Sequence, residues 1–395
     1  MADNNENKVL NVPHLRFPEF SGEWDSERLE NLTVSIGDGL HSTPVYCEQG
    51  DYCFINGNNI IDGKVSINEK TLRVTKEEAY KYNAALLKVD TILMSINGTI
   101  GNVALYNGEN IMLGKSACYI NPSSRIVREY LFHILSSPRI QAYFQGEVTG
   151  TTIKNLSLRT IRGSKILLPS NEEQKKIARL FSLVDERIAT QNKIIEDLKK
   201  LKSAIVDKLY SSTNGKTYSF CQLFEVVNEK NKKLAYKNVL SASQELGMIE
   251  RSNINIDIKF EQESISGYKI VRKGDYVVHL RSFQGGFAFS DTTGICSPAY
   301  TILRPNDLVV YGYLSHFFTS KPFIKSLKLV TYGIRDGRSI NVDEWLDMPI
   351  LLPSAQEQMR ILTIVNAIDA KLHNEAKVQF CLSSQKSYLL NTMFI

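Results

Sequence analysis

Apolar residues recur at alternating steps of three and four along two segments of the chain, which is the spacing of a helix that pairs with another helix. In the first segment these positions run from Ile177 to Leu209, and 184 residues later they run from Ile361 to Met393 in the same phase. Both polar interruptions of the first segment, Gln191 and Lys202, coincide with polar positions of the second, Glu375 and Lys386. Ordinary amphipathic helices on separate domains would explain the spacing, but not the matched phase and length.

Each segment begins within a near copy of one motif, ILLPSNEEQKKI from Ile166 and ILLPSAQEQMRI from Ile350. After the first proline, the serine or asparagine is suited to cap a helix, and the two glutamates suit the positive end of a helix dipole. No Pro or Gly interrupts until Gly215. The pattern predicts two helices of about 39 residues, each roughly 58 Å long. Antiparallel pairing within the chain would bury both seams and place one globular domain at each end of a rod.

The segments before each motif predict mixed α/β domains. Short runs bounded by Gly, Asn and Asp are typical of strands, such as DYCFIN, DTILMSI, YVVHL and AYTILRP. Two further stretches, YLFHILSSPRIQAYFQG and YLSHFFTSKPFIKSL, have helical periodicity with a proline break. The predicted fold is a mixed α+β protein with a pseudo-twofold internal repeat. Its expected parts are a first globular domain (1–165), a central helical spacer (166–215), a second globular domain (216–349) and a C-terminal helical spacer (350–395).

Length and composition agree with a globular protein of more than one domain, since the chain has 395 residues, 43% hydrophobic and 23% charged. The first ten residues, MADNNENKVL, do not resemble a secretory signal, and no apolar run reaches membrane-spanning length. We therefore expect a cytoplasmic protein without a membrane partner. Six scattered cysteines form no CxxC pair, which predicts reduced, structural residues.

The net charge of +5 is less informative than the distribution of the acids. No acid lies between Glu147 and Glu172, or between Asp307 and Asp336, although basic residues occur in both stretches. These residues are Lys154, Arg159, Arg162 and Lys165 in the first stretch and Lys321, Lys325, Lys328 and Arg335 in the second. Each stretch precedes an ILLP motif, so each half has a basic strip of the kind that tracks phosphates. Chance clustering on a solvated face remains the alternative interpretation.

Motifs for catalysis and for metal binding are missing, so we expect no catalytic and no metal-binding residues. The stretch GENIMLGKS resembles a phosphate-binding loop, but five residues separate its glycines where the motif has four. It is better interpreted as a strand that enters a turn. The six histidines form no HExxH pair, and His133 and His316 occupy equivalent positions on an apolar helix face, which favours a core or capping role. We found no paired-carboxylate nuclease cluster.

Two Gly-rich loops, SINGTIGNV and HLRSFQGGF, hold equivalent places in the two halves but differ in their side chains. Arg, Asn and Gln side chains bind base edges in the major groove, so these loops suit two readers of different DNA sequence. Plain β-turns are the alternative. The candidate DNA-binding residues on this hypothesis are Asn97, Thr99, Thr151 and Lys154 in the first domain and Arg281, Gln284, Arg335 and Arg338 in the second.

Several stretches resemble the specificity subunit of type I DNA restriction-modification systems, and the resemblance covers essentially the whole chain. They are LRFPEFSGEWDSERLENL, DGLHSTPVY, FINGNNIIDGK and the two motif segments LLPSNEEQKKIARLFSLVDERI and LLPSAQEQMRILTIVNAID. The family-like loops of the first domain add His41 and Asn58 to the DNA-binding candidates.

The resemblance implies two target recognition domains on an antiparallel helical pair, each reading one half of a bipartite, asymmetric site in double-stranded DNA. Half-sites one turn of DNA apart, about 34 Å, require a rigid spacer of this kind. It also implies that the helices dock modification subunits, expected to be two, and that restriction or translocase subunits join the complex. S-adenosylmethionine, ATP and magnesium would bind those partners, and this chain would need no cofactor. The chain itself has no NPPY-like or Walker motif.

Two other classes of function stay open at this level. An enzyme, such as a fused nuclease or methyltransferase, would modify or cut DNA unaided. A structural adaptor would use its paired helices only to bridge proteins. The second seam is the weaker one, with Glu375 in it and Thr363 and Asn366 nearby, so its burial is expected to depend more on partner subunits.

Overall fold

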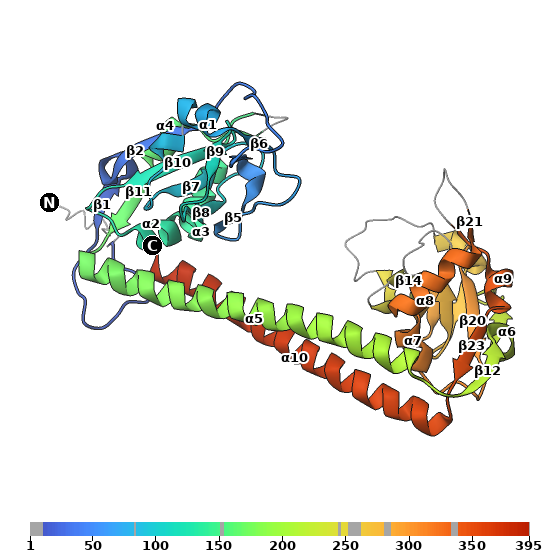
Figure 1. Cartoon of the computed structure of the whole chain (residues 1–395). Coiled ribbons are helices and arrows are strands. Elements are labelled where there is room, and N and C mark those ends of the chain that lie inside the picture. Colours follow the sequence, from blue (N-terminus) through green and yellow to red (C-terminus); the bar gives the residue numbers. More distant parts are fainter. Residues whose placement is uncertain are drawn as a thin grey trace. The chain divides into compact units, whose positions relative to one another are not determined.

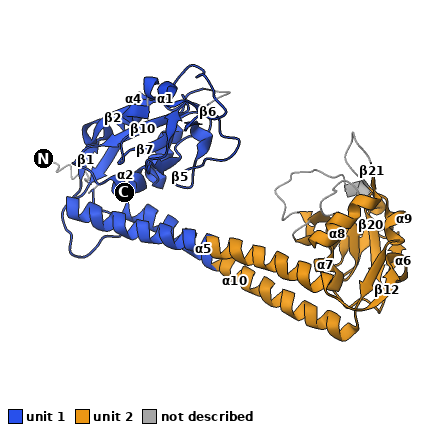
Figure 2. Ribbon diagram, in the orientation of Figure 1, with its two compact units in different colours: residues 1–192, 378–395 blue, residues 193–377 orange. Residues whose placement is uncertain are grey.

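The computed structural model describes residues 11–82, 84–150, 154–243, 246–251, 262–279, 286–332 and 339–394. The chain forms two compact units: unit 1 contains residues 1–192 and 378–395, and unit 2 contains residues 193–377. The boundary passes through two long helices, α5 (Asn171–Ser211) and α10 (Ala355–Met393) (Figure 2). Each unit therefore consists of a sheet domain and a part of both helices.

The sheet domain of unit 1 is built on a four-stranded antiparallel sheet in the order β2-β10-β7-β8, and a second sheet has the order β6-β3-β9 (Figure 1). The strands of this unit are β1 (Asp25–Arg28), β2 (Thr33–Asp38), β3 (Tyr52–Ile55), β4 (Ile60–Ile61), β5 (Lys64–Val65), β6 (Arg73–Val74), β7 (Ile92–Ser95), β8 (Val103–Leu105), β9 (Ile111–Leu113), β10 (Ala117–Pro122) and β11 (Lys165–Leu168). Its helices, besides α5 and α10, are η1 (Leu29–Leu32), η2 (Gly57–Asn59), α1 (Lys76–Tyr82), η3 (Ala84–Leu86), α2 (Arg128–Leu135), α3 (Pro138–Gly146) and α4 (Leu158–Gly163).

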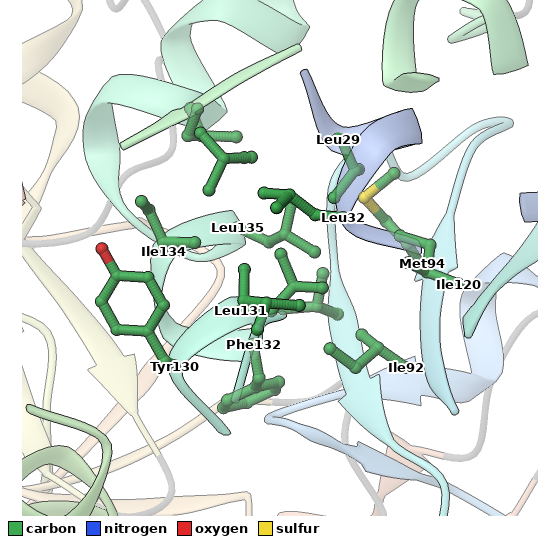
Figure 3. Packing of buried hydrophobic residues seen from close by; sticks show 14 of the residues in the cluster. Leu29, Leu32, Ile92, Met94, Ile120, Tyr130, Leu131, Phe132, Ile134 and Leu135 are labelled. Carbon is green, nitrogen blue, oxygen red and sulfur yellow. The ribbon is translucent and has the colours of Figure 1, made fainter. Parts of the chain in front are cut away.

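The main core of unit 1 lies between the four-stranded sheet and α2. Figure 3 shows Leu131 and Leu135 of α2 among the side chains of Leu32, Ile92 and Met94, which belong to η1 and β7. All five side chains are fully buried. Burial of each side chain of this size stabilises the fold by about 1.5–3 kcal/mol, so this interface holds α2 against the sheet.

Unit 2 repeats this architecture, since its four-stranded sheet has the order β13-β20-β17-β18, with the same antiparallel pairings. Its strands are β12 (Lys216–Ser219), β13 (Phe224–Val227), β14 (Leu240–Ser243), β15 (Gly247–Glu250), β16 (Lys269–Val271), β17 (Tyr276–Val278), β18 (Phe287–Phe289), β19 (Gly294–Cys296), β20 (Thr301–Pro305), β21 (Thr331–Tyr332), β22 (Ser339–Ile340) and β23 (Pro349–Leu352). Its helices, besides α5 and α10, are α6 (Phe220–Leu223), η5 (Gln262–Gly267), α7 (Tyr313–Phe317), α8 (Lys321–Ser326), η6 (Leu327–Val330) and α9 (Val342–Leu346).

The two sheet domains differ in detail. In unit 1, strand β9 pairs in parallel with β3, whereas in unit 2 strand β19 pairs antiparallel with β16. The buried carboxylate of Asp275 in unit 2 forms an ion pair with Arg304 at 2.9 Å. In unit 1 the residue that aligns with Arg304 is Asn121, which is buried and accepts a hydrogen bond from Thr91. The two sheet domains therefore share a strand order but have different buried polar pairs.

The long helices pair antiparallel within each unit. In unit 1 the ring of Phe181 on α5 stacks on Phe394, just beyond the end of α10, at 5.4 Å. In unit 2 the Lys202 ammonium on α5 contacts Asp369 on α10 at 2.5 Å. Residue numbers rise on one helix as they fall on the other, which gives the antiparallel direction. The two helices predicted from the seams are thus confirmed, with lengths of 41 and 39 residues.

The shorter elements also follow the predicted pattern. DYCFIN contains β3, DTILMSI contains β7, YVVHL contains β17 and AYTILRP contains β20. The proline breaks separate α2 from α3 and α7 from α8, and in each second helix the proline lies in the first turn. Proline is tolerated there because the first turn leaves its N–H groups unbonded in any case. The mixed α+β fold class is therefore confirmed.

Candidate nucleic-acid interface

Five chain segments of unit 1 meet at one end of its sheets. Strand β2 ends at Asp38 opposite Cys118, and β7 ends at Ser95 opposite Ala117, so both strands end where β10 begins. In the second sheet the parallel strands β3 and β9 end together at the pair Ile55 and Leu113. The turns that follow these strands therefore lie beside one another. We call this surface the loop face; it comprises residues 38–41, 56–59, 96–99, 114–116 and 154–155.

Hydrogen bonds join these turns to one another. The Ser116 hydroxyl accepts from the Gly57 amide at 2.8 Å and lies 2.8 Å from the Asn56 side-chain oxygen, to which it donates. The Asn97 side-chain amide donates to the Lys115 carbonyl at 2.9 Å, and the Gly98 amide donates to the Lys154 carbonyl at 3.1 Å. Since each turn is bonded to its neighbours, the backbone that carries the exposed side chains of the loop face has a fixed conformation.

Glycine is required at two points of the loop face. Gly98 has a φ of +76°, a left-handed conformation that costs any side chain with a Cβ about 1–2 kcal/mol. A Cβ at Gly114 would lie 2.4 Å from the side-chain oxygen of Asn56 and 2.7 Å from the Phe54 ring. Gly98 therefore allows a left-handed turn, and Gly114 allows the close approach of two turns.

The predicted residues of the first domain that the structure describes all lie on the loop face. Asn58, Thr99 and Lys154 are exposed, and Asn97 is half-buried because its amide holds the Lys115 carbonyl. The His41 side chain is 70% exposed, and its Nε2 lies 2.7 Å from an Asp38 carboxylate oxygen. Residues up to 113 positions apart in the chain, from His41 to Lys154, are thus brought together on one surface.

Lys115 belongs to the same surface, although the sequence did not point to it. It lies in the turn between β9 and β10, is exposed, and is next to Ser116, which holds the Gly57 loop. The signal was present in GENIMLGKS, which is a strand that enters a turn, as predicted. Within the described residues, neither Lys115 nor Lys154 forms an ion pair, so both ammonium groups are available to phosphates.

The remaining predicted residues lie outside the described residues. Thr151 belongs to residues 151–153, and Arg281 and Gln284 belong to residues 280–285, between β17 and β18. Arg335 and Arg338 belong to residues 333–338, between β21 and β22. The flanking backbone is described: the His279 amide donates to the Gly286 carbonyl at 2.8 Å, at the end of the sheet equivalent to the β7–β8 turn of unit 1.

The two basic strips are not continuous surfaces of free charge. Lys154 lies on the loop face, whereas Arg162 on α4 donates to the Ile36 carbonyl at 2.6 Å and Lys165 belongs to β11. In unit 2 the Lys321 ammonium lies 3.9 Å from Asp207. The basic residues of one strip therefore have different roles. They are neighbours in the sequence but lie on a helix, a turn and a strand.

Over the described ranges, no group of three or more His, Cys, Asp or Glu side chains is arranged to hold a metal ion. Burial raises the pKa of the Cys118 thiol to about 12, which makes this thiol unreactive. All six cysteines are free, and Cys53, Cys118 and Cys296 are buried in the sheet domains, as structural residues should be. Cys221 and Cys381 are exposed. None of the described helices has the length and apolar character needed to cross a membrane.

Comparison with known proteins shows which class of protein the chain resembles. Residues 22–200 match the family model described as type I restriction modification DNA specificity domain. Over 98% of its length the chain is 24% identical to the putative type I restriction enzyme MjaX specificity subunit of Methanocaldococcus jannaschii, 96% of which is covered. The MjaVIII specificity subunit of the same organism is 23% identical, with coverages of 96% and 93%.

The fold agrees with this class. The crystal structure of a type I restriction-modification S subunit from M. genitalium superposes with a TM-score of 0.56 at 17% identity, covering 97% of this chain and 99% of that one. The matched model covers the first sheet domain and most of α5, and the second half repeats the same strand order. Residues 22–200 thus match the DNA specificity domain of type I restriction-modification systems, and nearly the whole chain is similar to the specificity subunits of these systems.

Proposed function

We propose that the chain is the DNA-reading subunit of its complex and that each sheet domain reads one half of a bipartite, asymmetric site in double-stranded DNA. The observation that carries this proposal is the internal repeat. One strand order occurs in both units, and the two Gly-rich loops, which differ in their side chains, follow equivalent strands. On the loop face, Asn58, Thr99 and His41 would contact base edges, while Lys115 and Lys154 hold phosphates. The other candidates for contacts with DNA are Thr151 in the first domain and Arg281, Gln284, Arg335 and Arg338 in the second.

The paired helices would set the spacing of the half-sites and dock two modification subunits, which methylate adenine. Exposed apolar side chains support docking, because large apolar groups on a helix surface favour a protein partner. In unit 1 these include Leu183 on α5 and Phe380 and Tyr388 on α10, with exposures of 45%, 71% and 63%. Restriction or translocase subunits would complete the complex in the cytoplasm. S-adenosylmethionine, ATP and magnesium would bind these partners, so this chain would not be catalytic alone.

The decisive experiment maps methylated adenines in the host genome with this gene present and deleted. We expect a two-part motif with a constant spacer that disappears on deletion. An unchanged methylation pattern in a strain whose partner subunits are expressed would contradict the proposal. The rival enzyme is tested with the purified chain, DNA, magnesium and S-adenosylmethionine, where we expect neither cleavage nor methylation.

The loop face is tested with the variant K115A/K154A in the assembled complex. We expect weaker DNA binding and a slope of log affinity against log salt that is less negative by about 2, because two phosphate contacts are lost. Arg125 follows the opposite end of β10 and pairs with Glu27 at 3.1 Å, so R125A is a matched control with unchanged slope. Equal effects of the two variants would place the DNA elsewhere. Failure of the wild-type complex to bind any DNA, at low as well as high salt, would favour the adaptor.

A further inference from the structure

A three-residue polar cluster occurs in unit 1 where the sheet domain meets the helix pair. The Asp185 carboxylate on α5 contacts the Lys386 ammonium on α10 at 2.6 Å. Its other oxygen lies 4.0 Å from Nδ1 of His133 on α2, which is beyond hydrogen-bond distance. The His133 ring also lies 5.0 Å from the Phe181 ring of α5. One carboxylate thus faces both the second helix and the sheet domain.

Unit 2 contains the same cluster, built from the equivalent elements. The Asp369 carboxylate on α10 contacts Lys202 on α5 at 2.5 Å and lies 3.9 Å from Nε2 of His316 on α7. Asp369 and Lys386 lie 184 residues after Asp185 and Lys202. Each helix therefore contributes the aspartate of one cluster and the lysine of the other. We call these clusters the first and second joints.

The lysines of the joints occupy seam positions of the helix pair, where an apolar residue would bury more apolar surface. A polar group at such a position lowers stability but specifies which residues pair. Lys386 and Lys202 keep 27% of their side-chain surface, and Asp185 and Asp369 keep 33% and 37%. Because these groups are partly buried, the attraction between the two charges is screened less than at a fully exposed site.

The histidines of the joints are uncharged; His133 is buried, and the His316 side chain is 17% exposed. His133 is only 2% exposed, and burial together with nearby Lys386 lowers its pKa to about 3. For His316, burial and Lys202 lower the pKa, against the opposing effects of Asp369 and a hydrogen bond with Asn366. The charge of each aspartate is therefore balanced by the lysine of the other helix. The neutral histidine is the residue of the sheet domain that contacts this aspartate.

We propose that Asp185 and Asp369 are positioning residues, each of which holds a sheet domain in one orientation on the helix pair. Each carboxylate forms an ion pair with the lysine of the opposite helix and, on its other side, packs against the neutral histidine of the sheet domain. The inference rests on the proposed function only for its consequence: a domain held in one orientation reads its half-site at one spacing, and a loosened joint tolerates other spacings.

The experiment compares D185N, D369N and the charge swap D185K/K386D in the full chain, assembled with its methyltransferase subunits. The first measurement is the methylation rate at the natural site relative to sites whose spacer is one base pair longer or shorter. We expect each asparagine variant to raise the relative rate at altered spacers by about fivefold, since an ion pair of this exposure contributes modestly. The swap should return the ratio to within about twofold of the wild type, because it restores the pair. The control is E196Q, which removes the exposed Glu196–Lys200 pair within α5 and should leave the ratio unchanged.

Hydrogen exchange supplies a second measurement that does not depend on DNA. We expect D185N to accelerate exchange in α2 and at the end of α10, D369N to accelerate exchange in α7, and the swap to restore protection in α2. Wild-type exchange in D185N and D369N, or a swap that behaves like D185N, would overturn the positioning role. If the wild-type complex methylates no bipartite site, the proposed function fails, and the exchange data alone decide whether the joints exist.

Discussion

Two single residues, the histidines of the joints, show how burial suppresses protonation. His133 and His316 occupy equivalent helix positions, as expected for core rather than catalytic histidines. The His133 ring lies between aromatic neighbours and Asp185, and the His316 ring lies near Asp369. A buried imidazole resists protonation because the charged ring would lose its hydration. This has a measurable consequence for unit 1.

Acid should destabilise unit 1 through His133. Its ring has a pKa of about 3 in the folded chain and an ordinary value of 6.5. As the pH falls below 6.5, the unfolded chain takes up a proton that the folded chain refuses, so the free energy of unfolding decreases. We expect a loss of about 2 kcal/mol from this group at pH 5. In H133Q, this part of the pH dependence should disappear.

The measurement is hydrogen-exchange protection of α2 at pH 7 and pH 5, corrected for the intrinsic exchange rate. His373 on α10 is exposed, so H373Q should keep the wild-type pH dependence. If H133Q lost as much protection between pH 7 and pH 5 as the wild type, another group would be responsible.

At the scale of elements, the repeated ILLPS motif has a specific role at the start of each long helix. The buried Gln174 side chain donates to the Pro169 carbonyl at 3.0 Å and accepts from the Val127 amide at 2.9 Å. Gln358 makes the same bonds to Pro353 and Val310 in unit 2. The motif thus attaches the first turn of a helix to the loop before α2 or α7.

Replacing Gln174 should detach the start of α5 from the sheet domain. Q174A leaves the Val127 amide and the Pro169 carbonyl without their partner, and each unsatisfied buried group costs about 1–3 kcal/mol. We expect faster hydrogen exchange in α2 and in the first turns of α5, with α7 unchanged, and Q358A should give the converse pattern. K175A, which removes an exposed ion pair with Glu172, should have no effect. Uniform acceleration in both units after Q174A would argue against this local attachment.

At the scale of the whole molecule, each unit is completed by the far end of the other repeat's helix. Phe394 follows α10 and is 3% exposed, with its ring 5.6 Å from Tyr130 and 5.4 Å from Phe181 in unit 1. The equivalent Tyr210 ends α5 in unit 2, where its hydroxyl donates to the Tyr313 carbonyl at 2.6 Å. Neither repeat would bury its own core alone.

Truncation at either position should therefore affect the unit that contains it, not the unit that holds the rest of its repeat. We expect F394A to destabilise unit 1 by about 3–5 kcal/mol, the usual cost of removing a buried phenylalanine ring. Exchange in α2 should accelerate while α7 stays protected, and Y210A should do the reverse. An F394A variant with loss of protection in α7 would show that the repeats, rather than the units, unfold together.

The sequence by itself determined the elements and the repeat. Seam positions, caps and proline breaks depend on neighbours within a few residues, so the two long helices and strands such as β3 and β7 could be predicted from local patterns. It also directed attention to Asn97 and Lys154, because polar loops with glycine are a local signal.

Only the tertiary structure decided which distant residues share a surface or a charge. The loop face joins Lys115 to Asn58 and Lys154 through hydrogen bonds between separate turns, and no local pattern records such contacts. Lys202 and Lys386 read as flaws in two apolar seams, until the antiparallel pairing places each beside the aspartate of the opposite helix. Electrostatic partners are set by distance in space, and that distance depends on every element that folds between them.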